Sequence, residues 1–282
     1  LSSEPWPGTV ALYDAAEDAN YVLNEVIAAQ SIVGVTDTPM HMAPAGLIDH
    51  GPLLQVSLNS GTLESIGDAA LLAGGNLMAI GDGTPGHWEL FQFRDAQLVG
   101  DRTWQISHRL RGQLGSDGVM PEVWPAGSMV VLMDGGPQQI ALAAALRRQA
   151  RHYRYGPARR GYDDPSYEHE VHAFDGNGLR PYRPAHLRAA PEGGGHRFSW
   201  IRRTRIDGDD WSVPEVPLGE ESEGYLVRVM QGSALRRESL VTMPSYSYDP
   251  VQDGISGSYE VSVAQVSARY GPGPFARIEL VA

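Results

Sequence analysis

The chain has 282 residues, enough for about two domains, and it is rich in glycine (33) and proline (20), while 42% of its residues are apolar. That balance predicts a folded chain with many tight turns and argues against disorder. Cysteine is absent, which excludes disulfides, thiolate nucleophiles and cysteine-based metal sites, and the net charge of −12 disfavours nucleic acid as a partner.

Charge is distributed unevenly along the chain. Residues 1–93 contain 11 acids and neither Arg nor Lys, whereas residues 94–282 hold all 22 Arg against the remaining 23 of the 34 acids. We expect the acidic first third to face either a basic partner or the Arg-rich part of the same chain. No apolar run approaches the ~20 residues of a membrane span, and no signal-peptide pattern is present. Because the chain begins with Leu1, we expect a segment of a longer polypeptide.

Short runs of alternating or β-branched residues, separated by Gly and Pro turns, predict a β-rich first part of the chain. Helical composition is limited to one turn at 68–73, closed by two glycines, and to the alanine-rich segment 141–149. The predicted strands lie at 10–13, 21–27, 31–35, 53–58, 77–80, 87–93, 102–108, 129–133 and 168–174.

A turn cluster at 175–178 marks the expected domain boundary, and a proline-stiffened connector over 179–184 follows it. Beyond the connector the alternation of apolar and polar residues becomes regular, which is typical of half-buried strands. The strands predicted there lie at 186–189, 196–203, 225–230, 235–242, 246–248, 258–264 and 276–281.

The pattern of this last part resembles a known fold. Trp200 is the expected core residue of its second strand, and Tyr259, Val261 and Val263 alternate on one face of a later strand. An early Trp beneath a Tyr-x-Val-x-Val strand resembles the fibronectin type III fold, and Tyr259 is similar to that family's corner tyrosine. The resemblance implies a β-sandwich over residues 178–282, a binding or spacing module with no active site of its own.

One motif has residues typical of metal sites. On a strand, Glu168, Glu170 and His172 share one face, while His169 lies on the other. Zinc proteases need His-Glu-x-x-His on a helix, and here the second His is one position too close. We therefore interpret the segment as a solvated strand.

Three other motifs lack the spacing that their chemistry requires. The acidic segment 207–210 lacks the spacing and terminal Glu of a calcium loop. The glycine-rich turn 81–86 lacks the Gly-Lys-Ser/Thr of a phosphate loop, and Ser116 beside Asp117 has no patterned His partner. We predict no catalytic residue, no cofactor-binding residue and no metal ligand.

The segment from Arg147 to Arg160 contains six Arg interleaved with His152, Tyr153 and Tyr155. Arg and Tyr suit charge contact and stacking, so contact with DNA or with a partner is one interpretation. The alternatives are a solvated face and pairing with the acidic first third, which the net charge of the chain favours. We expect no specific nucleic-acid binding.

Several segments together resemble one family. They are the segments 6–13, 75–82, 88–93, 178–187, 200–205 and 217–222 and the motif Leu110-Arg-Gly-Gln-Leu-Gly-Ser116. They are similar to the C-terminal part of the large tail-tip protein of gene transfer agents, sometimes called the megatron, and to related phage tail-tip host-specificity proteins. The resemblance implies a virion structural protein that helps to close the tail channel, contacts the host envelope and opens for DNA passage.

We therefore predict a mainly β chain, with a β-rich tail-protein domain or two small subdomains over residues 1–177 and a fibronectin type III-like sandwich over 178–282. Its predicted place is the tail tip of a virion assembled in the bacterial cytoplasm, with no enzymatic activity and no cofactor. Expected partners are other tail-tip and baseplate proteins, two further copies forming a homotrimer around the tail axis, and a host-envelope receptor or glycan. The alternative is a carbohydrate-binding accessory region of a secreted glycoside hydrolase, in which Trp6, Trp124 and Trp211 stack on sugar rings.

Overall fold

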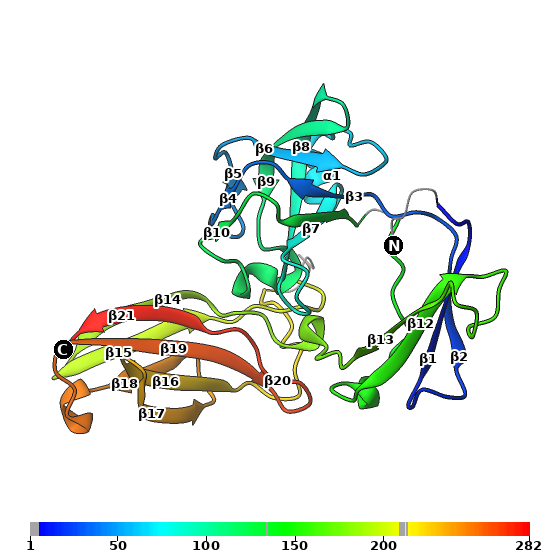
Figure 1. Cartoon of the computed structure of the whole chain (residues 1–282). Coiled ribbons are helices and arrows are strands. Elements are labelled where there is room, and N and C mark those ends of the chain that lie inside the picture. Colours follow the sequence, from blue (N-terminus) through cyan, green and yellow to red (C-terminus); the bar gives the residue numbers. More distant parts are fainter. Residues whose placement is uncertain (1–5, 134, 209–211, 213) are drawn as a thin grey trace. The chain divides into compact units, whose positions relative to one another are not determined.

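The computed structural model describes residues 6–133, 135–208, 212 and 214–282 (Figure 1). Strands form nearly all of the regular structure, which confirms the prediction of a mainly β chain. The chain divides into two compact units, Leu1–Gly176 and Asn177–Ala282. Among the described residues, no helix combines the length and the apolar character needed to cross a bilayer.

Within the described residues, the two ends of the first unit meet in one four-stranded antiparallel sheet. Its order is β13 (Glu168–His172), β12 (Arg151–Pro157), β1 (Val10–Ala15) and β2 (Val22–Ile27). The Arg-rich segment therefore contains a strand, β12, which the sequence analysis did not predict. Because β12 pairs with β1, basic residues late in the unit lie beside acidic residues at its start.

The segment between β2 and β12 folds into a closed antiparallel barrel. Across the described residues its six strands follow the order β9, β6, β3, β11, β7 and β8, and β8 pairs with β9 to close the ring. Closure satisfies the backbone groups that an open sheet edge would expose. The strands are β3 (Val33–Thr36), β6 (Leu54–Leu58), β7 (Leu77–Gly81), β8 (Trp88–Gly100), β9 (Thr103–Leu110) and β11 (Met129–Leu132). The interior contains Leu54, Val56, Met78, Ile80, Phe91, Phe93, Trp104, Ile106 and Val130.

Short elements complete the first unit. β5 (Ile48–Asp49) extends the barrel sheet beside β9, and β4 (Met40–His41) pairs with β10 (Val123–Trp124). The helical turn predicted at 68–73 is confirmed as α1 (Asp68–Leu72). A 3₁₀ segment, η1 (Gln113–Gly118), follows β9.

The helix predicted over 141–149 is wrong. The described residues of this segment form a 3₁₀ turn, η2 (Ala144–Leu146), and Arg148 then adopts a left-handed backbone conformation with φ 61°. So short a helix is not stable through propensity alone. Packing does not compensate, because no residue of η2 is buried.

The second unit is a β-sandwich with the fibronectin type III arrangement, as predicted. In its described residues one sheet has the order β14 (Ala185–Glu192), β15 (Gly195–Ile201) and β18 (Ser245–Tyr248). The other has the order β17 (Ala234–Val241), β16 (Tyr225–Gln231) and β19 (Ser258–Ser267), with β21 (Ala276–Val281) and the short β20 (Gly271–Pro272) also paired to β19. Two 3₁₀ turns, η3 (Asn177–Leu179) and η4 (Pro250–Asp253), complete it.

Alternation along the strands decides which side chains enter the sandwich core. Phe198 and Trp200 of β15 are buried, and so are Val261 and Val263 of β19. Trp200 packs at a steep angle against Tyr225, with the ring centroids 5.2 Å apart. The predicted core role of Trp200 and the alternation of the Tyr-x-Val-x-Val strand are confirmed.

Tyr259 differs from a corner tyrosine in the hydrogen bond of its hydroxyl. Tyr259 is buried near the start of β19, as expected, but the hydrogen bond of its hydroxyl is with a side chain, 3.2 Å from Nδ1 of His196. A corner tyrosine contacts the upstream backbone instead. Burial raises the pKa of Tyr259, so the hydroxyl stays protonated at neutral pH.

Replacing Phe198 by alanine is expected to destabilise the sandwich by about 3–5 kcal/mol, because the change removes a fully buried ring and leaves a cavity. Leu240→Ala is the control, since Leu240 lies on β17 with 70% of its surface exposed and should change stability by no more than about 0.5 kcal/mol. Urea unfolding followed by tryptophan fluorescence measures both. Equal losses in the two variants would contradict the assigned core.

Candidate functional site

The barrel interior encloses a carboxylate. Glu89 lies on the same face of β8 as Phe91 and Phe93 and is 0% exposed. Arg111, which is also 0% exposed, pairs with it through two hydrogen bonds, Nε to Oε1 at 2.7 Å and Nη2 to Oε2 at 2.8 Å. An ionised carboxylate is stable in such surroundings only when it is paired and hydrogen-bonded. The two residues therefore depend on each other.

Further hydrogen bonds extend this pair to other segments. The indole N–H of Trp124 donates to Glu89 Oε2 at 2.7 Å, and the backbone N–H of Gly112 donates to Oε1 at 3.1 Å. Arg111 Nη1 donates to the carbonyl oxygen of His41 at 2.6 Å. The Glu89–Arg111 pair thus ties together β8, the loop after β9, β10 and β4.

Glycine is required at position 112. Its φ is 60°, and a Cβ there would lie 2.5 Å from the Cβ of Asp117. Residues with a side chain rarely adopt this left-handed backbone conformation, whereas glycine does so readily. The Leu110-Arg-Gly motif therefore has a structural explanation, in which Arg111 supplies the charge and Gly112 a backbone donor.

A second ion pair flanks the first. Arg109 Nε lies 3.0 Å from Asp49 Oδ2, its Nη1 donates to the carbonyl of Pro52 at 2.9 Å, and Arg111 Nη1 lies 3.4 Å from the same Oδ2. Burial raises the pKa of Asp49, but hydrogen bonds from Arg109 and from the N–H of Gly51 outweigh it and hold that pKa below its usual value. Asp49 is therefore ionised at neutral pH and neutralises buried cations.

Ser116 has a positioning role in this region. Its Oγ accepts the N–H of Leu90 at 2.8 Å and donates to the carbonyl of Gln113 at 2.8 Å. These bonds hold η1 against β8. The geometry of the whole network is that of a structural clamp, because its donors and acceptors already contact each other.

The Arg-rich segment pairs with acids of its own unit. Arg151 Nε lies 2.7 Å from Asp14 Oδ2, and Arg154 Nη2 lies 2.9 Å from Asp18 Oδ1. Two more pairs of the same segment are Arg148 with Asp175 and Arg160 with Asp164. Arg151 and Arg154 therefore pair with the acidic first third, as one of the interpretations proposed, whereas Arg148 and Arg160 pair with acids that lie later in the unit.

Strand β13 places Glu168, Glu170 and His172 on one face, as the period-2 pattern predicted, and His169 on the other. The hydroxyl of Tyr155 donates to Glu168 at 2.7 Å and to Glu170 at 3.0 Å, and His172 Nε2 lies 2.6 Å from Glu170 Oε2. Burial, then these two carboxylates, raise the pKa of Tyr155. The hydrogen bonds from His172 and Tyr155 lower the pKa of Glu170.

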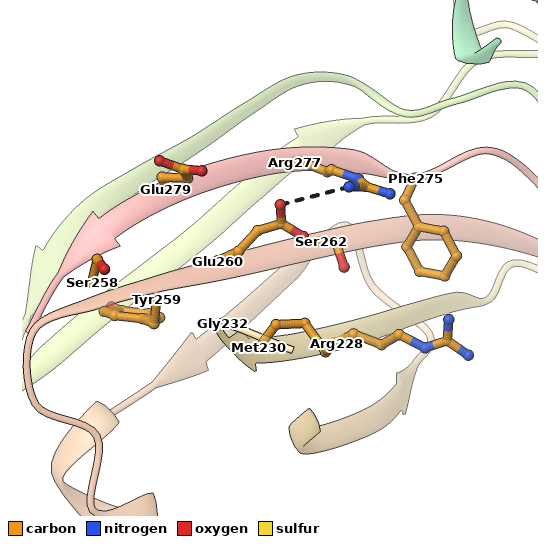
Figure 2. A pocket seen from close by; sticks show the side chains of 10 residues that line it. All are labelled: Arg228, Met230, Gly232, Ser258, Tyr259, Glu260, Ser262, Phe275, Arg277 and Glu279. Atoms are coloured by element: carbon orange, nitrogen blue, oxygen red, sulfur yellow. Dashed lines mark ion pairs between the residues drawn. The ribbon is translucent and has the colours of Figure 1, made fainter. Parts of the chain in front are cut away.

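A groove of about 440 Å³ lies on the outer face of the β16–β19–β21 sheet (Figure 2). The guanidinium of Arg228 lies 4.9 Å from the centre of the Phe275 ring, and Arg277 Nη1 lies 3.8 Å from Glu260 Oε2. Exposed cations and a carboxylate around an aromatic ring suit contact with a polar partner. No motif in the sequence pointed to this groove, although it is lined by outward-facing residues of three predicted strands.

The tryptophans expected to stack on sugars do not form a platform. Trp124 is 2% exposed and donates its N–H to Glu89, so the expectation that it stacks on a sugar is wrong. Trp6 is half-buried. Trp211 lies outside the described residues, as do residues 209 and 210 of the acidic turn. The glycine-rich turn 81–86 joins β7 to β8.

Residues 31–131 match the family described as Rcc01698-like, C-terminal. The match begins just before β3 and ends in β11, so it spans the described barrel and leaves the four-stranded sheet and the sandwich outside. It agrees with a domain associated with gene transfer agents. No curated protein matches the chain.

Solved structures resemble the chain weakly. Domains d3–d4 of the rat CD45 extracellular region give a TM-score of 0.29 at 9% identity, covering 53% of this chain and 72% of that one. A two-domain fibronectin type III segment of chicken tenascin gives 0.27 at 8%, covering 88% and 99%. The FN1–FN3 domains of chicken CNTN1 give 0.27 at 10%, covering 98% and 90%. The assignment of the sandwich rests on its own strand order.

Arg111→Ala is expected to destabilise the first unit by about 3–5 kcal/mol, because it leaves Glu89 buried and unpaired. Urea unfolding of the full chain measures the loss. The control is Arg148→Ala, since Arg148 and Asp175 are each 61% exposed and such a pair contributes at most about 1 kcal/mol. A loss no larger than that of the control would contradict the clamp.

Proposed function

We propose that this chain is a structural segment of the tail tip of a phage-like particle of the gene transfer agent kind. The observation that carries the proposal is the family match over residues 31–131, which spans the barrel. The motif resemblances on both sides of the barrel support extending the proposal to the whole chain. No enzymatic activity is part of the proposed role.

Rigidity supports a role in assembly. The barrel is closed, and the Glu89–Arg111 pair ties its wall to the adjoining loops. The close-packed core of the sandwich likewise holds its surface side chains in fixed positions relative to one another. In the proposed mechanism, three copies around the tail axis hold such modules in fixed positions, help to close the channel and repack on envelope contact to let DNA pass.

The groove on the sandwich is the surface that we assign to host contact. It offers the Arg228 and Arg277 guanidinium groups, the Glu260 carboxylate and the Phe275 ring, which together can hydrogen-bond and stack against an envelope glycan. The rival role, as a carbohydrate-binding accessory region of a hydrolase, has less support because Trp124 is buried.

Electron cryo-microscopy of purified particles tests the location. We expect three copies of the chain around the distal end of the tail axis, visible as extra density when a small tag is fused to the C-terminus. Particles with the untagged chain are the control. The proposal fails if the chain is absent from intact particles or is present there as a monomer.

The double variant Arg228→Ala and Arg277→Ala is expected to reduce particle attachment to host cells by at least about tenfold, which corresponds to the loss of roughly 1.4 kcal/mol of binding free energy. Arg197→Ala is the control, because Arg197 is exposed on the other sheet of the sandwich. Attachment counts with labelled particles measure the effect. Normal attachment by the double variant would remove the groove from the proposal and leave the tail-tip location untouched.

A further inference from the structure

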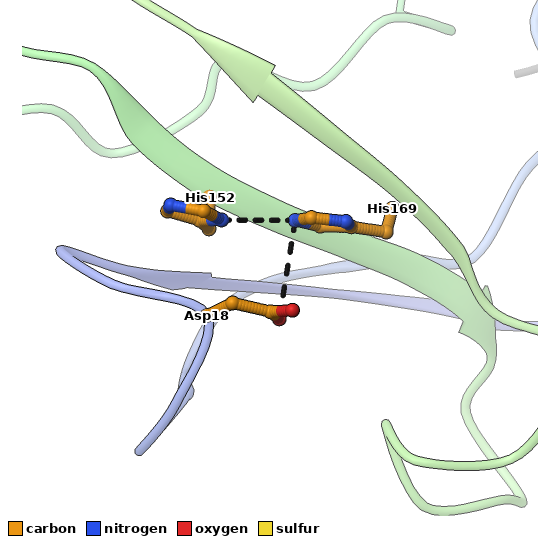
Figure 3. Close-up of side chains that lie close together, drawn as sticks. All are labelled: Asp18, His152 and His169. Carbon is orange, nitrogen blue, oxygen red and sulfur yellow. Dashed lines mark hydrogen bonds and ion pairs between the residues drawn. The ribbon is translucent and has the colours of Figure 1, made fainter.

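The face of the four-stranded sheet that lies opposite Glu170 and His172 gathers two other histidines (Figure 3). β12 and β13 pair with Arg154 opposite His169. Residues two positions apart on a strand share a face, so His152 is a diagonal neighbour of His169. Both imidazoles therefore lie on the same side of the sheet.

Asp18 joins these histidines from the connection between β1 and β2. A tight turn shapes this connection, since the N–H of Ala19 donates to the carbonyl of Glu17 at 2.7 Å and Asn20 has φ 54°. Figure 3 shows the Asp18 carboxylate directed at the ring of His169. Residues from opposite ends of the first unit thus meet at one point.

The ligand-type atoms of the three side chains converge. His152 Nδ1 lies 3.0 Å from His169 Nε2, which lies 3.9 Å from Asp18 Oδ1. One ligand-type atom from each of the three side chains lies within 4.8 Å of the other two. The two rings are nearly parallel, with 8° between their planes. Ligands at 2.0–2.1 Å from a tetrahedral zinc ion stand about 3.3–3.4 Å apart, and the His152–His169 and His169–Asp18 distances of 3.0 Å and 3.9 Å lie on either side of that spacing.

The carboxylate is held in its charged form. Asp18 Oδ1 accepts the hydroxyl of Tyr21 at 2.5 Å and Arg154 Nη2 at 2.9 Å. These hydrogen bonds, that of Tyr21 first, lower the pKa of Asp18. Both donors act on Oδ1, the oxygen that lies 3.9 Å from His169 Nε2, and they hold this oxygen beside the imidazoles. Arg154 forms an ion pair with this carboxylate.

We propose that Asp18, His152 and His169 bind one divalent transition-metal ion of the zinc class. The inference is independent of the tail-tip proposal and departs from the expectation that the chain has no metal ligand. Two imidazoles and one carboxylate suit zinc and its neighbours, whereas calcium and magnesium prefer all-oxygen sites. Three protein ligands leave the fourth position to water or to a donor from a neighbouring molecule.

The ion would join segments that are far apart in the sequence. Asp18 lies near the start of the first unit, while His152 and His169 lie near its end. The two facing nitrogens lie at hydrogen-bonding distance from each other, and coordination to the ion would replace that contact. Its proposed role is to lock the β1–β2 connection onto β12 and β13.

Isothermal titration of the full, EDTA-treated chain with zinc chloride tests the proposal. We expect one ion per wild-type chain, and we expect His152→Ala and His169→Ala each to weaken binding by at least about tenfold. Asp18→Asn should weaken it as well, because the amide is neutral. Thermal unfolding in EDTA checks that each variant is folded.

His172→Ala is the matched control, because His172 lies on the same strand as His169 and on the opposite face. It should retain the wild-type affinity within about twofold. Cobalt(II) in place of zinc gives a second readout, since its visible absorption reports a tetrahedral site with nitrogen ligands. The proposal is overturned if the wild type shows no saturable binding, or if His172→Ala weakens binding as much as His169→Ala does.

Discussion

A carboxylate inside an apolar barrel has to be neutralised, and Arg111 does this for Glu89 through a bidentate ion pair. The requirement has consequences beyond these two side chains. The backbone of Gly112 must adopt a left-handed conformation to donate to the same carboxylate, and Trp124 must turn inward. One buried charge thereby fixes the strand β8, the turn after β9 and the β4–β10 ladder. Breaking a buried pair is costly, so the barrel is locked in one arrangement.

Charge pairing also explains the uneven distribution of acids and arginines along the chain. The first third has acids without a basic residue, and its partners arrive later in the sequence. β12 brings Arg151 to Asp14 and Arg154 to Asp18 by pairing with β1. These acids of the first third are therefore balanced by arginines in the folded sheet, although no basic residue lies near them in the sequence.

Neighbouring residues on a strand point to opposite faces of the sheet, so two adjacent side chains can serve different roles. On β13, Glu170 and His172 bond to each other on one face, while His169 joins the Asp18 cluster on the other. On the sandwich, Val261 enters the core while Glu260 faces the groove. A strand thus contributes to the stability of the fold with one set of side chains and to surface recognition with the next.

The sequence by itself determined the β character of the chain, most strand positions and the core of the sandwich. On a half-buried strand every second residue is apolar, and Trp200 and Val261 lie at such positions. The alanine-rich composition of 141–149 predicted a helix that does not form, because no residue of η2 is buried against another element. Only the tertiary structure decided that Trp124 is buried, that Glu89 meets Arg111 and that Asp18 meets His152 and His169. These contacts join residues far apart in sequence, and no local pattern encodes which strands pair.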